Sequence, residues 1–401
     1  MAHNLFIAAT DKDVGKSTLS FAIIHRLLEM EKKVGFMKPV GQRWLPTQWG
    51  EVEEDVILMK EAFDLAEHPA LMNPVVIKKG FTEEYIFKTI KPDLSSKIIE
   101  CYDRVAFDKD YVIIEGTGHA GVGSVIDHSN AAVAALLDAK VILIAKGGIG
   151  NTIDRLELNR VFFESRGVHV IGVIINKVID RKYEEVKDAI QRYCDEKKLK
   201  LFGVIRYSSV LDNPTLGTVI EELEPEVIQE TGERNVVIDN YMIGASYLGE
   251  IVDYMKQKTG NLLFLFPSRR VDLIFGIPTM MRLKNFESTR IFSVLLTGQT
   301  RPDELSCETL RGENINVLYK EGDTFSIISK LSTISIKTRP SDSYKIDVIK
   351  RMVTKEIDFK RVLSMLMPAQ VPDTPVTKLR RWIRWLLNRI RRFFTKTKKA
   401  E

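Results

Sequence analysis

The residues of greatest chemical interest are Gly15-Lys16-Ser17, which stand between the short apolar run Leu5–Ala9 and an amphipathic stretch. A strand, a loop and the start of a helix in this order are typical of a phosphate-binding loop, or P-loop. The backbone N–H groups of such a loop and the helix N-terminus form a concave site for phosphate oxygens. Lys16 would reach the β- and γ-phosphates, and the Ser17 hydroxyl would be a magnesium ligand. This order of elements predicts an ATP site and argues against a chance Gly-Lys-Ser at a helix start.

Two carboxylates could complete a metal site beside this loop. Glu115 closes the apolar run Tyr111–Glu115, and a carboxylate at the C-terminal end of a parallel strand faces the ligand crevice. Asp55 lies in an acidic run, where its alternative role is that of a helix N-cap. Magnesium prefers one or two carboxylates together with phosphate oxygens and water. The predicted metal ligands are therefore Ser17, Asp55 and Glu115.

Further candidate side chains end other predicted strands. Lys38 is either a second phosphate-binding cation or a surface lysine whose ammonium reaches solvent. Asn176 either reads the base through its amide or stabilises a turn, and Lys177 follows it. The predicted catalytic residues are Lys16 and Lys38. The predicted nucleotide contacts are Lys12, Asp13, Val14, Gly15, Lys16, Ser17, Thr18, Asn176 and Lys177.

Two histidines flank the glycine-rich loop that follows Glu115. They are His119 and His128, nine residues apart and without a cysteine partner. That spacing is a weak pattern for zinc, so we expect them to have structural roles or to lie at the edge of a substrate.

Alternating strands and helices over residues 1–222 must position these side chains. Six short apolar runs predict buried strands, and amphipathic stretches such as Thr18–Glu29 and Asp154–Arg166 predict helices between them. This alternation predicts an α/β class with a parallel, doubly wound sheet. The predicted strands are Leu5–Ala9, Lys33–Lys38, Tyr111–Glu115, Lys140–Ala145, Val168–Asn176 and Leu201–Ile205.

A second, smaller α/β unit is predicted over residues 235–366. It has a helical pattern at Ala245–Lys258 and three strand-like runs, namely Asn261–Phe266, Ile291–Thr297 and Ile315–Tyr319. A proline-containing linker over 367–378 and a basic amphipathic tail over 379–399 follow it.

The composition is that of a globular protein in a reducing compartment. Apolar residues make up 44% and charged residues 28% of the 401 residues, which fits two or three domains. The three cysteines stand singly, and the first apolar run is too short for a signal peptide or a membrane span. We therefore expect a cytoplasmic protein, and a homo-oligomer.

The net charge of +5 comes from the end of the chain. The last 24 residues have a net charge of +9, so the remainder has −4, which argues against nucleic acid as a partner. Residues 379–394 have a helical period that places leucines, tryptophans and phenylalanines on one face and arginines on the other. This pattern predicts binding to an anionic membrane surface, on the inner face of the plasma membrane, or to an acidic protein partner.

These residues resemble the dethiobiotin synthetase family, whose variant P-loop has five residues between its glycines. Residues 9–17 match that loop, with Ala9 in place of the first glycine and Lys12 in place of a threonine. Lys38-Pro39 is similar to the lysine–proline strand with which the family contacts phosphate. The resemblance implies these roles: Asp55 and Glu115 as the magnesium acids, and Asn176-Lys177 as the pair that reads the base.

A denser resemblance links the chain to the N-terminal part of long-form phosphate acetyltransferases. The shared motifs are Glu115–Ser124, Ser129-Asn130, Gly147–Gly150 and Ile174–Val178. Residues 236–330 resemble the DRTGG domain of that family, whose naming motifs would fall at 268–270 and 296–299. We expect the acetyltransferase domain that normally follows to be absent from this chain.

Two hypotheses about function follow. The first is a magnesium-ATP-binding regulator or weak ATPase attached to a membrane surface. The second is an ATP-dependent enzyme that transfers phosphoryl to a small carboxylate or carbamate, as in dethiobiotin synthetase. Gly41–Trp44 stands where that family has a small Ser/Gly substrate segment, so we do not expect the biotin reaction itself.

Overall fold

A six-stranded parallel sheet organises the first part of the computed structural model, which describes residues 2–88, 91–232, 234–282, 289–334 and 336–366. The strand order is β10-β9-β8-β1-β7-β2. All six predicted strands are confirmed, because their apolar, largely uncharged runs are buried on both faces of the sheet. The strands are β1 (His3–Ala9), β2 (Val34–Met37), β7 (Tyr111–Glu115), β8 (Lys140–Lys146), β9 (Val170–Val178) and β10 (Leu201–Arg206).

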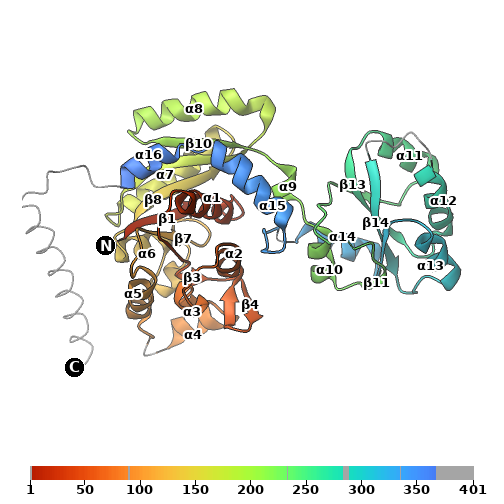
Figure 1. Cartoon of the computed structure of the whole chain (residues 1–401), viewed down its shortest axis with the longest axis horizontal. Coiled ribbons are helices and arrows are strands. Elements are labelled where there is room, and N and C mark those ends of the chain that lie inside the picture. Colours follow the sequence, from red (N-terminus) through yellow and green to blue (C-terminus); the bar gives the residue numbers. More distant parts are fainter. Residues whose placement is uncertain (1, 89–90, 233, 283–288, 335, 367–401) are drawn as a thin grey trace, which may run out of the picture.

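Helices cover both faces of this sheet, as the predicted doubly wound α/β class requires (Figure 1). They are α1 (Lys16–Glu29), α5 (Leu94–Val105), α6 (Asn130–Leu136), α7 (Gly150–Glu164) and α8 (Tyr183–Glu196). Strand β1 pairs with β7 on one side and with β8 on the other. The chain therefore reverses its direction of travel across the sheet next to β1, and that is where ligands bind in such folds.

The chain segment between β2 and α5 covers one end of the sheet. It contains a short antiparallel hairpin and a two-residue parallel pair of strands. Its elements are β3 (Val40–Gly41), β4 (Trp44–Thr47), β5 (Gly50–Glu53), α2 (Glu54–Phe63), α3 (Pro69–Met72), β6 (Val75–Val76) and α4 (Phe81–Phe87). This segment places the start of α2 near the carboxyl end of β1.

A second sheet of five strands forms the smaller α/β domain. Its order is β11-β15-β14-β13-β12, and only β11 runs antiparallel to its neighbour. The strands are β11 (Glu226–Gln229), β12 (Asn240–Ile243), β13 (Gly260–Pro267), β14 (Thr289–Gly298) and β15 (Asn316–Glu321). The predicted central strands are confirmed.

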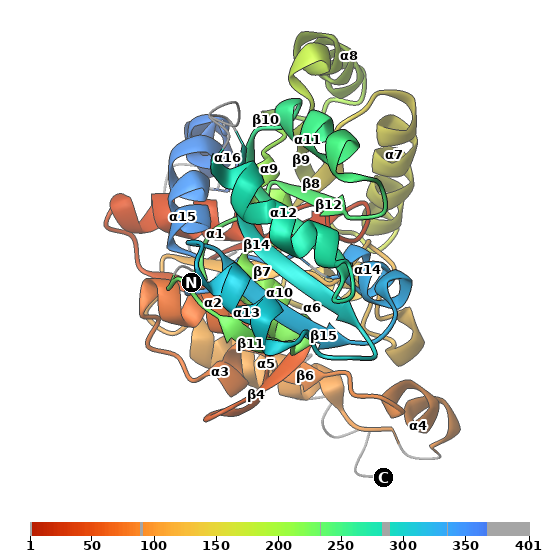
Figure 2. The same cartoon turned by 90° about the vertical axis from the view of Figure 1, so that its right-hand side faces the viewer.

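Two separate apolar cores lie on the two faces of the second sheet. Helices α11 (Leu248–Lys256), α12 (Val271–Arg282) and α13 (Glu304–Arg311) cover the face that looks away from the first domain, as Figure 2 shows. Helices α10 (Leu216–Leu223) and α14 (Thr324–Ser332) cover the other face. The helices nearest the first domain are therefore those that flank the second domain in sequence.

The chain returns to the first domain after the second one. The α15 helix (Ser343–Val348) lies beside α9 (Ser209–Asp212), the π-helical segment η3 (Ile349–Val353) lies against α1, and α16 (Phe359–Leu366) lies against β1 and β10 (Figure 1). Their apolar side chains, including Ile349, Val353 and Val362, belong to the core of the first sheet. This packing differs from the predicted single unit over 235–366, because only the three-dimensional fold shows which core these amphipathic residues join.

The short remaining elements connect these parts. They are η1 (Ser124–Ile126), η2 (Asp180–Lys182) and α9 (Ser209–Asp212), which leads into the second domain. No helix among the described residues is both long and apolar enough to cross a bilayer. The predicted linker 367–378 and basic tail 379–399 lie outside the described residues.

Candidate functional site

The loop between β1 and α1 has the backbone shape that its sequence predicts. Gly15 has a φ of 104°, and a Cβ built on it would lie 2.3 Å from the Nδ2 atom of Asn176. Glycine is therefore the residue that fits this position, for backbone and for packing reasons. Helix α1 begins at the next residue, so its free N–H groups point into the loop.

Lys16 extends over this loop, and its hydrogen-bond partners within the described part of the chain are two carbonyl oxygens. Its ammonium lies 3.3 Å from the carbonyl oxygen of Gly118 and 3.5 Å from that of Asp11. Burial lowers the pKa of Lys16 to about 8, although the charge of Glu115 opposes this effect. A partly desolvated ammonium whose described partners are two carbonyls is suited to bind an anionic group.

Ser17 joins the two predicted metal acids at one point. Its Oγ lies 2.8 Å from Oδ1 of Asp55 and 3.0 Å from Oε1 of Glu115. Neighbouring oxygens around an octahedral magnesium ion, with bonds of roughly 2.1 Å, are about 3 Å apart. The hydroxyl has one proton for two carboxylates, and Oε2 of Glu115 has no hydrogen-bond partner among the described residues. The three oxygens therefore fit the protein's share of a magnesium site.

The electrostatics of the two acids differ. Burial raises the pKa of Glu115, and the nearby charge of Asp55 raises it further. Burial also opposes the charge of Asp55, but ammonium groups beside it hold its pKa well below the usual range. Asp55 lies inside the first turn of α2, whose N-cap position is Glu53. Its carboxylate faces the site, unlike that of a capping residue.

Lys38 is buried among carboxylates at the end of β2. Its ammonium forms an ion pair with Asp55 and lies 3.0 Å from Oε1 of Glu53 and 3.4 Å from Oε1 of Glu115. Although burial opposes its charge, these carboxylates raise the pKa of Lys38. The surface-lysine alternative is wrong, because only 5% of this side chain is exposed.

Lys337 is a residue at this site that the sequence did not signal. Its ammonium lies 3.0 Å from Oδ2 of Asp55, 3.3 Å from Oε2 of Glu54 and 3.6 Å from Oε1 of Glu53. Lys337 and Asp55 are 282 residues apart in the sequence. No motif or periodicity in the sequence signals such a pair.

Asn176 holds the P-loop in this structure. Its Nδ2 donates to the carbonyl oxygen of Val14 at 2.8 Å, and its Oδ1 accepts from the N–H of Lys177 at 2.9 Å. The ammonium of Lys177 pairs with Asp212. Contact with a base stays a prediction for both residues.

Replacing Asn176 with alanine should weaken ATP binding about tenfold, since a hydrogen bond that orders the loop contributes roughly 1–1.5 kcal/mol. Because the amide acts on the loop, GTP affinity should fall by the same factor. Calorimetric titration of both nucleotides measures this. A change in the ratio of ATP to GTP affinity would instead show that Asn176 reads the base.

A second asparagine orders the loop after Glu115. The Nδ2 of Asn130 donates to the carbonyl oxygens of Thr117 and His119, both at 2.7 Å, and its Oδ1 accepts from the N–H of Thr117. These hydrogen bonds fix the position of the Gly118 carbonyl oxygen, which accepts a hydrogen bond from the ammonium of Lys16. In the sequence, Asn130 stands only in a motif shared with phosphate acetyltransferases, and nothing there signals that it orders this loop.

The histidines have local partners. His128 is buried, with Nδ1 2.7 Å from the carbonyl oxygen of Ile126 and Nε2 2.9 Å from Oγ of Ser95. The Nδ1 of His119 accepts from the N–H of Gly121. No group of three or more His, Cys, Asp or Glu suited to a metal occurs in the described part of the chain.

The P-loop and the carboxylates and lysines beside it line one cavity of about 490 Å³. All the predicted site residues line it except Val14, whose side chain is buried behind the loop. Two arginines, Arg43 and Arg206, add to its positive charge. The segments 332–334 and 336–338, which follow the second domain, form part of its wall.

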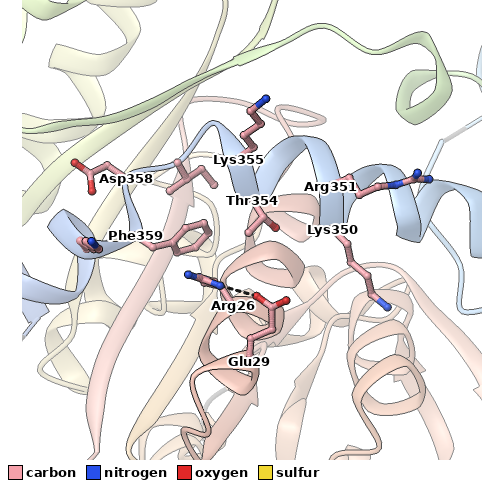
Figure 3. A pocket seen from close by; sticks show the side chains of 10 residues that line it. Arg26, Glu29, Lys350, Arg351, Thr354, Lys355, Asp358 and Phe359 are labelled. Atoms are coloured by element: carbon pink, nitrogen blue, oxygen red, sulfur yellow. Dashed lines mark hydrogen bonds and ion pairs between the residues drawn. The ribbon is translucent and has the colours of Figure 1, made fainter.

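Another cavity, of about 430 Å³, lies at the far end of α1. Figure 3 shows Arg26 and Glu29 of α1 joined by an ion pair, with Lys350 of the returning segment extending down on their side and Arg351 pointing away from them. Because Lys16 and Glu29 are at opposite ends of a 14-residue helix, roughly 20 Å long, this cavity is separate from the P-loop.

Comparison with known proteins confirms the predicted resemblance for both domains. Residues 3–215 match the family described as AAA domain, and residues 218–334 match the family described as DRTGG domain. Phosphate acetyltransferase from Nitratidesulfovibrio vulgaris is 24% identical over 376 residues, which are 92% of this chain and 52% of that protein. The chain spans about half the length of the phosphate acetyltransferases that it matches.

Two further similarities concern the first domain. ATP-dependent dethiobiotin synthetase BioD from Methanococcus vannielii is 27% identical over 206 residues, which are 50% of this chain and 92% of that protein. The solved structure of the MinD cell division protein from Aquifex aeolicus is 15% identical, with a TM-score of 0.34, over 53% of this chain and 85% of that chain.

Proposed function

Since the chain belongs to the AAA domain family, we propose that its first domain binds ATP with magnesium and that the bound nucleotide regulates the protein. The chain is a P-loop domain followed by a DRTGG domain, related to the N-terminal part of phosphate acetyltransferases and to BioD-like ATP-dependent enzymes. One observation carries the proposal. The Ser17 hydroxyl lies between the carboxylates of Asp55 and Glu115, directly after the P-loop lysine.

Each residue has a distinct task in this proposal. The loop N–H groups and Lys16 bind the phosphates, and Lys38 supports the charge of the terminal phosphate. Ser17, Asp55 and Glu115 would hold magnesium, which, when bound, neutralises charge on the β- and γ-phosphate oxygens. Asn176 and Asn130 hold the two loops in the shape that this binding needs.

A regulatory role is supported by the wall of the cavity. Part of that wall is the segment that leaves the second domain, so a phosphate in the cavity would lie beside a part of the chain that is joined directly to the second domain. A diffusible phosphoryl acceptor would have to share this space. We therefore infer that the nucleotide acts as a signal to the second domain.

Turnover of labelled ATP by the pure protein with magnesium tests this proposal against catalysis. A regulator should bind ATP but release phosphate far more slowly than a typical enzyme, which turns over at about 1 s⁻¹ or faster. Small carboxylates and carbamates should not accelerate the release. Failure to bind ATP at all would overturn the proposal.

Phosphoryl transfer to a small carboxylate or carbamate is the second candidate function. Lys38, buried among Glu53, Asp55 and Glu115, favours it, because a fixed ammonium at that point could stabilise charge on a phosphoryl group in transfer. Phosphate release that rises severalfold or more with one such acceptor would establish this function instead.

We also propose that residues 379–394 attach the protein to an anionic membrane surface. The proposal rests on the sequence alone, in which arginines occupy one helical face and Trp382, Trp385 and apolar residues suit the headgroup boundary. Each cation near such a surface contributes about 1 kcal/mol. The full chain should therefore float with anionic vesicles, and a 1–377 truncation should not.

Salt should weaken but not abolish this attachment. Charge interactions at the surface are screened within about 10 Å at ordinary ionic strength, whereas the burial of aromatic side chains persists. Neutral vesicles serve as the control. If both proteins float equally, or neither floats, the membrane proposal is wrong and an acidic protein partner becomes the better hypothesis.

A further inference from the structure

A stretch of chain outside both sheets passes beside the phosphate site. Helix α14 of the second domain ends at Ser332, and α15, which packs on the first domain, begins at Ser343. Between them, residues 332–334 and 336–338 line the nucleotide cavity. The connection from the second domain back to the first is therefore also a wall of the site.

Lys337 is the cation that this stretch places in the site. Its ammonium lies within 3.6 Å of three carboxylates, those of Asp55, Glu54 and Glu53, and 19% of its side chain is exposed. Lys337 is thus a charged group at the edge of the cavity, and its partners are the acids around the metal position.

The second domain holds this stretch on both sides of Lys337. Three residues before it, Ile334 packs against the core under α10 and α14. Two residues after it, Arg339 pairs with Glu221 of α10 and lies 3.8 Å from Glu222 of the same helix. Three residues span at most about 10 Å, so the ammonium cannot move far unless these anchors or the second domain move with it.

The charge arrangement indicates which part of a nucleotide Lys337 would meet. Asp55 turns Oδ1 toward Ser17 and Oδ2 toward Lys337. Magnesium in P-loop proteins bridges the β- and γ-phosphates. A cation on the far oxygen of Asp55, next to Lys38, therefore lies toward the terminal phosphate and away from the base.

We propose that Lys337 binds the terminal phosphate of ATP and so reports to the second domain whether that phosphate is present. The inference rests on the proposed nucleotide binding. With ATP, the ammonium exchanges its longer contacts to Glu53 and Glu54 for phosphate oxygens. With ADP it keeps its carboxylate partners, so the two nucleotides hold the connecting stretch differently.

Calorimetric titration of ATP and ADP, each with magnesium, tests the inference in the full chain. The Lys337→Ala variant should bind ATP about tenfold more weakly than the wild type, as expected for the loss of one hydrogen bond to a charged group. Its ADP affinity should change by less than about twofold. Lys337→Arg, which keeps the charge, should restore much of the ATP affinity.

Lys330 provides the matched control. It is an exposed lysine on α14, close to the same stretch, so Lys330→Ala removes the same charge outside the site. This variant should bind both nucleotides as the wild type does.

Hydrogen exchange provides a second readout. In the wild type, ATP should protect peptides that span residues 324–342 more than ADP does, and Lys337→Ala should abolish that difference. Equal loss of ATP and ADP affinity, no loss, or tighter ATP binding in Lys337→Ala would overturn the inference while leaving nucleotide binding intact. A wild-type protein that binds neither nucleotide would instead overturn the proposed function on which the inference rests.

Discussion

Replacing Lys16 with alanine should abolish nucleotide binding in a protein that remains folded. Among the residues that the structure describes, the ammonium donates to the carbonyl oxygens of Gly118 and Asp11, so its removal breaks no ion pair with a described carboxylate. In the complex it would make charge-assisted hydrogen bonds of about 1.5–3 kcal/mol each, and losing two of them weakens binding about 100-fold or more. Calorimetric titration with ATP and magnesium measures the loss.

Circular dichroism and thermal unfolding of Lys16→Ala should match the wild type, which separates lost binding from lost folding. An exposed lysine on α8, Lys187, gives the matched control, because its replacement with alanine removes the same charge far from the loop. Wild-type ATP affinity in folded Lys16→Ala would show that Gly15-Lys16-Ser17 is not a phosphate site.

Replacing either metal acid, by Glu115→Gln or Asp55→Asn, should remove most of the benefit that magnesium gives to ATP binding. Both carboxylates meet at the Ser17 hydroxyl, and each amide offers the metal a neutral and weaker oxygen. We expect the ratio of ATP affinity with magnesium to that with EDTA to fall about tenfold or more, from the loss of one charged interaction.

The direction in which ATP affinity changes without metal makes this prediction specific. In EDTA, removing a negative charge beside the phosphates should leave ATP affinity unchanged or tighten it, so general damage to the site would give the opposite result. Glu51→Gln is the control, because Glu51 is an acid on the nearby β5 strand that pairs with Lys78 outside the site. A variant that keeps the wild-type magnesium titration excludes its residue as a ligand.

The sequence alone determined the parts of this protein that depend on neighbours along the chain. The first sheet was predictable because each strand is a short apolar run buried on both faces, which is a local pattern. Gly15-Lys16-Ser17 was recognisable because a P-loop needs a strand before it and a helix after it. Glu115 was identifiable for a similar reason, since an acid that ends a buried parallel strand must face the crevice.

Other features were open in the sequence and depended on the fold. Lys38 could be a surface lysine or a buried cation, and Asp55 could be a helix cap or a site residue. Burial among carboxylates rules out the surface lysine, and the place of Asp55 inside the first turn of α2, with its carboxylate on Ser17, rules out the helix cap. Residue type and spacing are the same in either alternative, so only the packing of distant elements distinguishes them.

The tertiary structure alone decided which segments far apart in the chain lie together. Lys337 meets Asp55 across 282 residues, and the apolar residues of η3 and α16 join the first core rather than the second. A helical period tells which face of a segment will be buried, but it does not tell which of two apolar surfaces will bury it. That choice depends on shape and charge complementarity between segments far apart in the chain, and these properties exist only after the chain has folded.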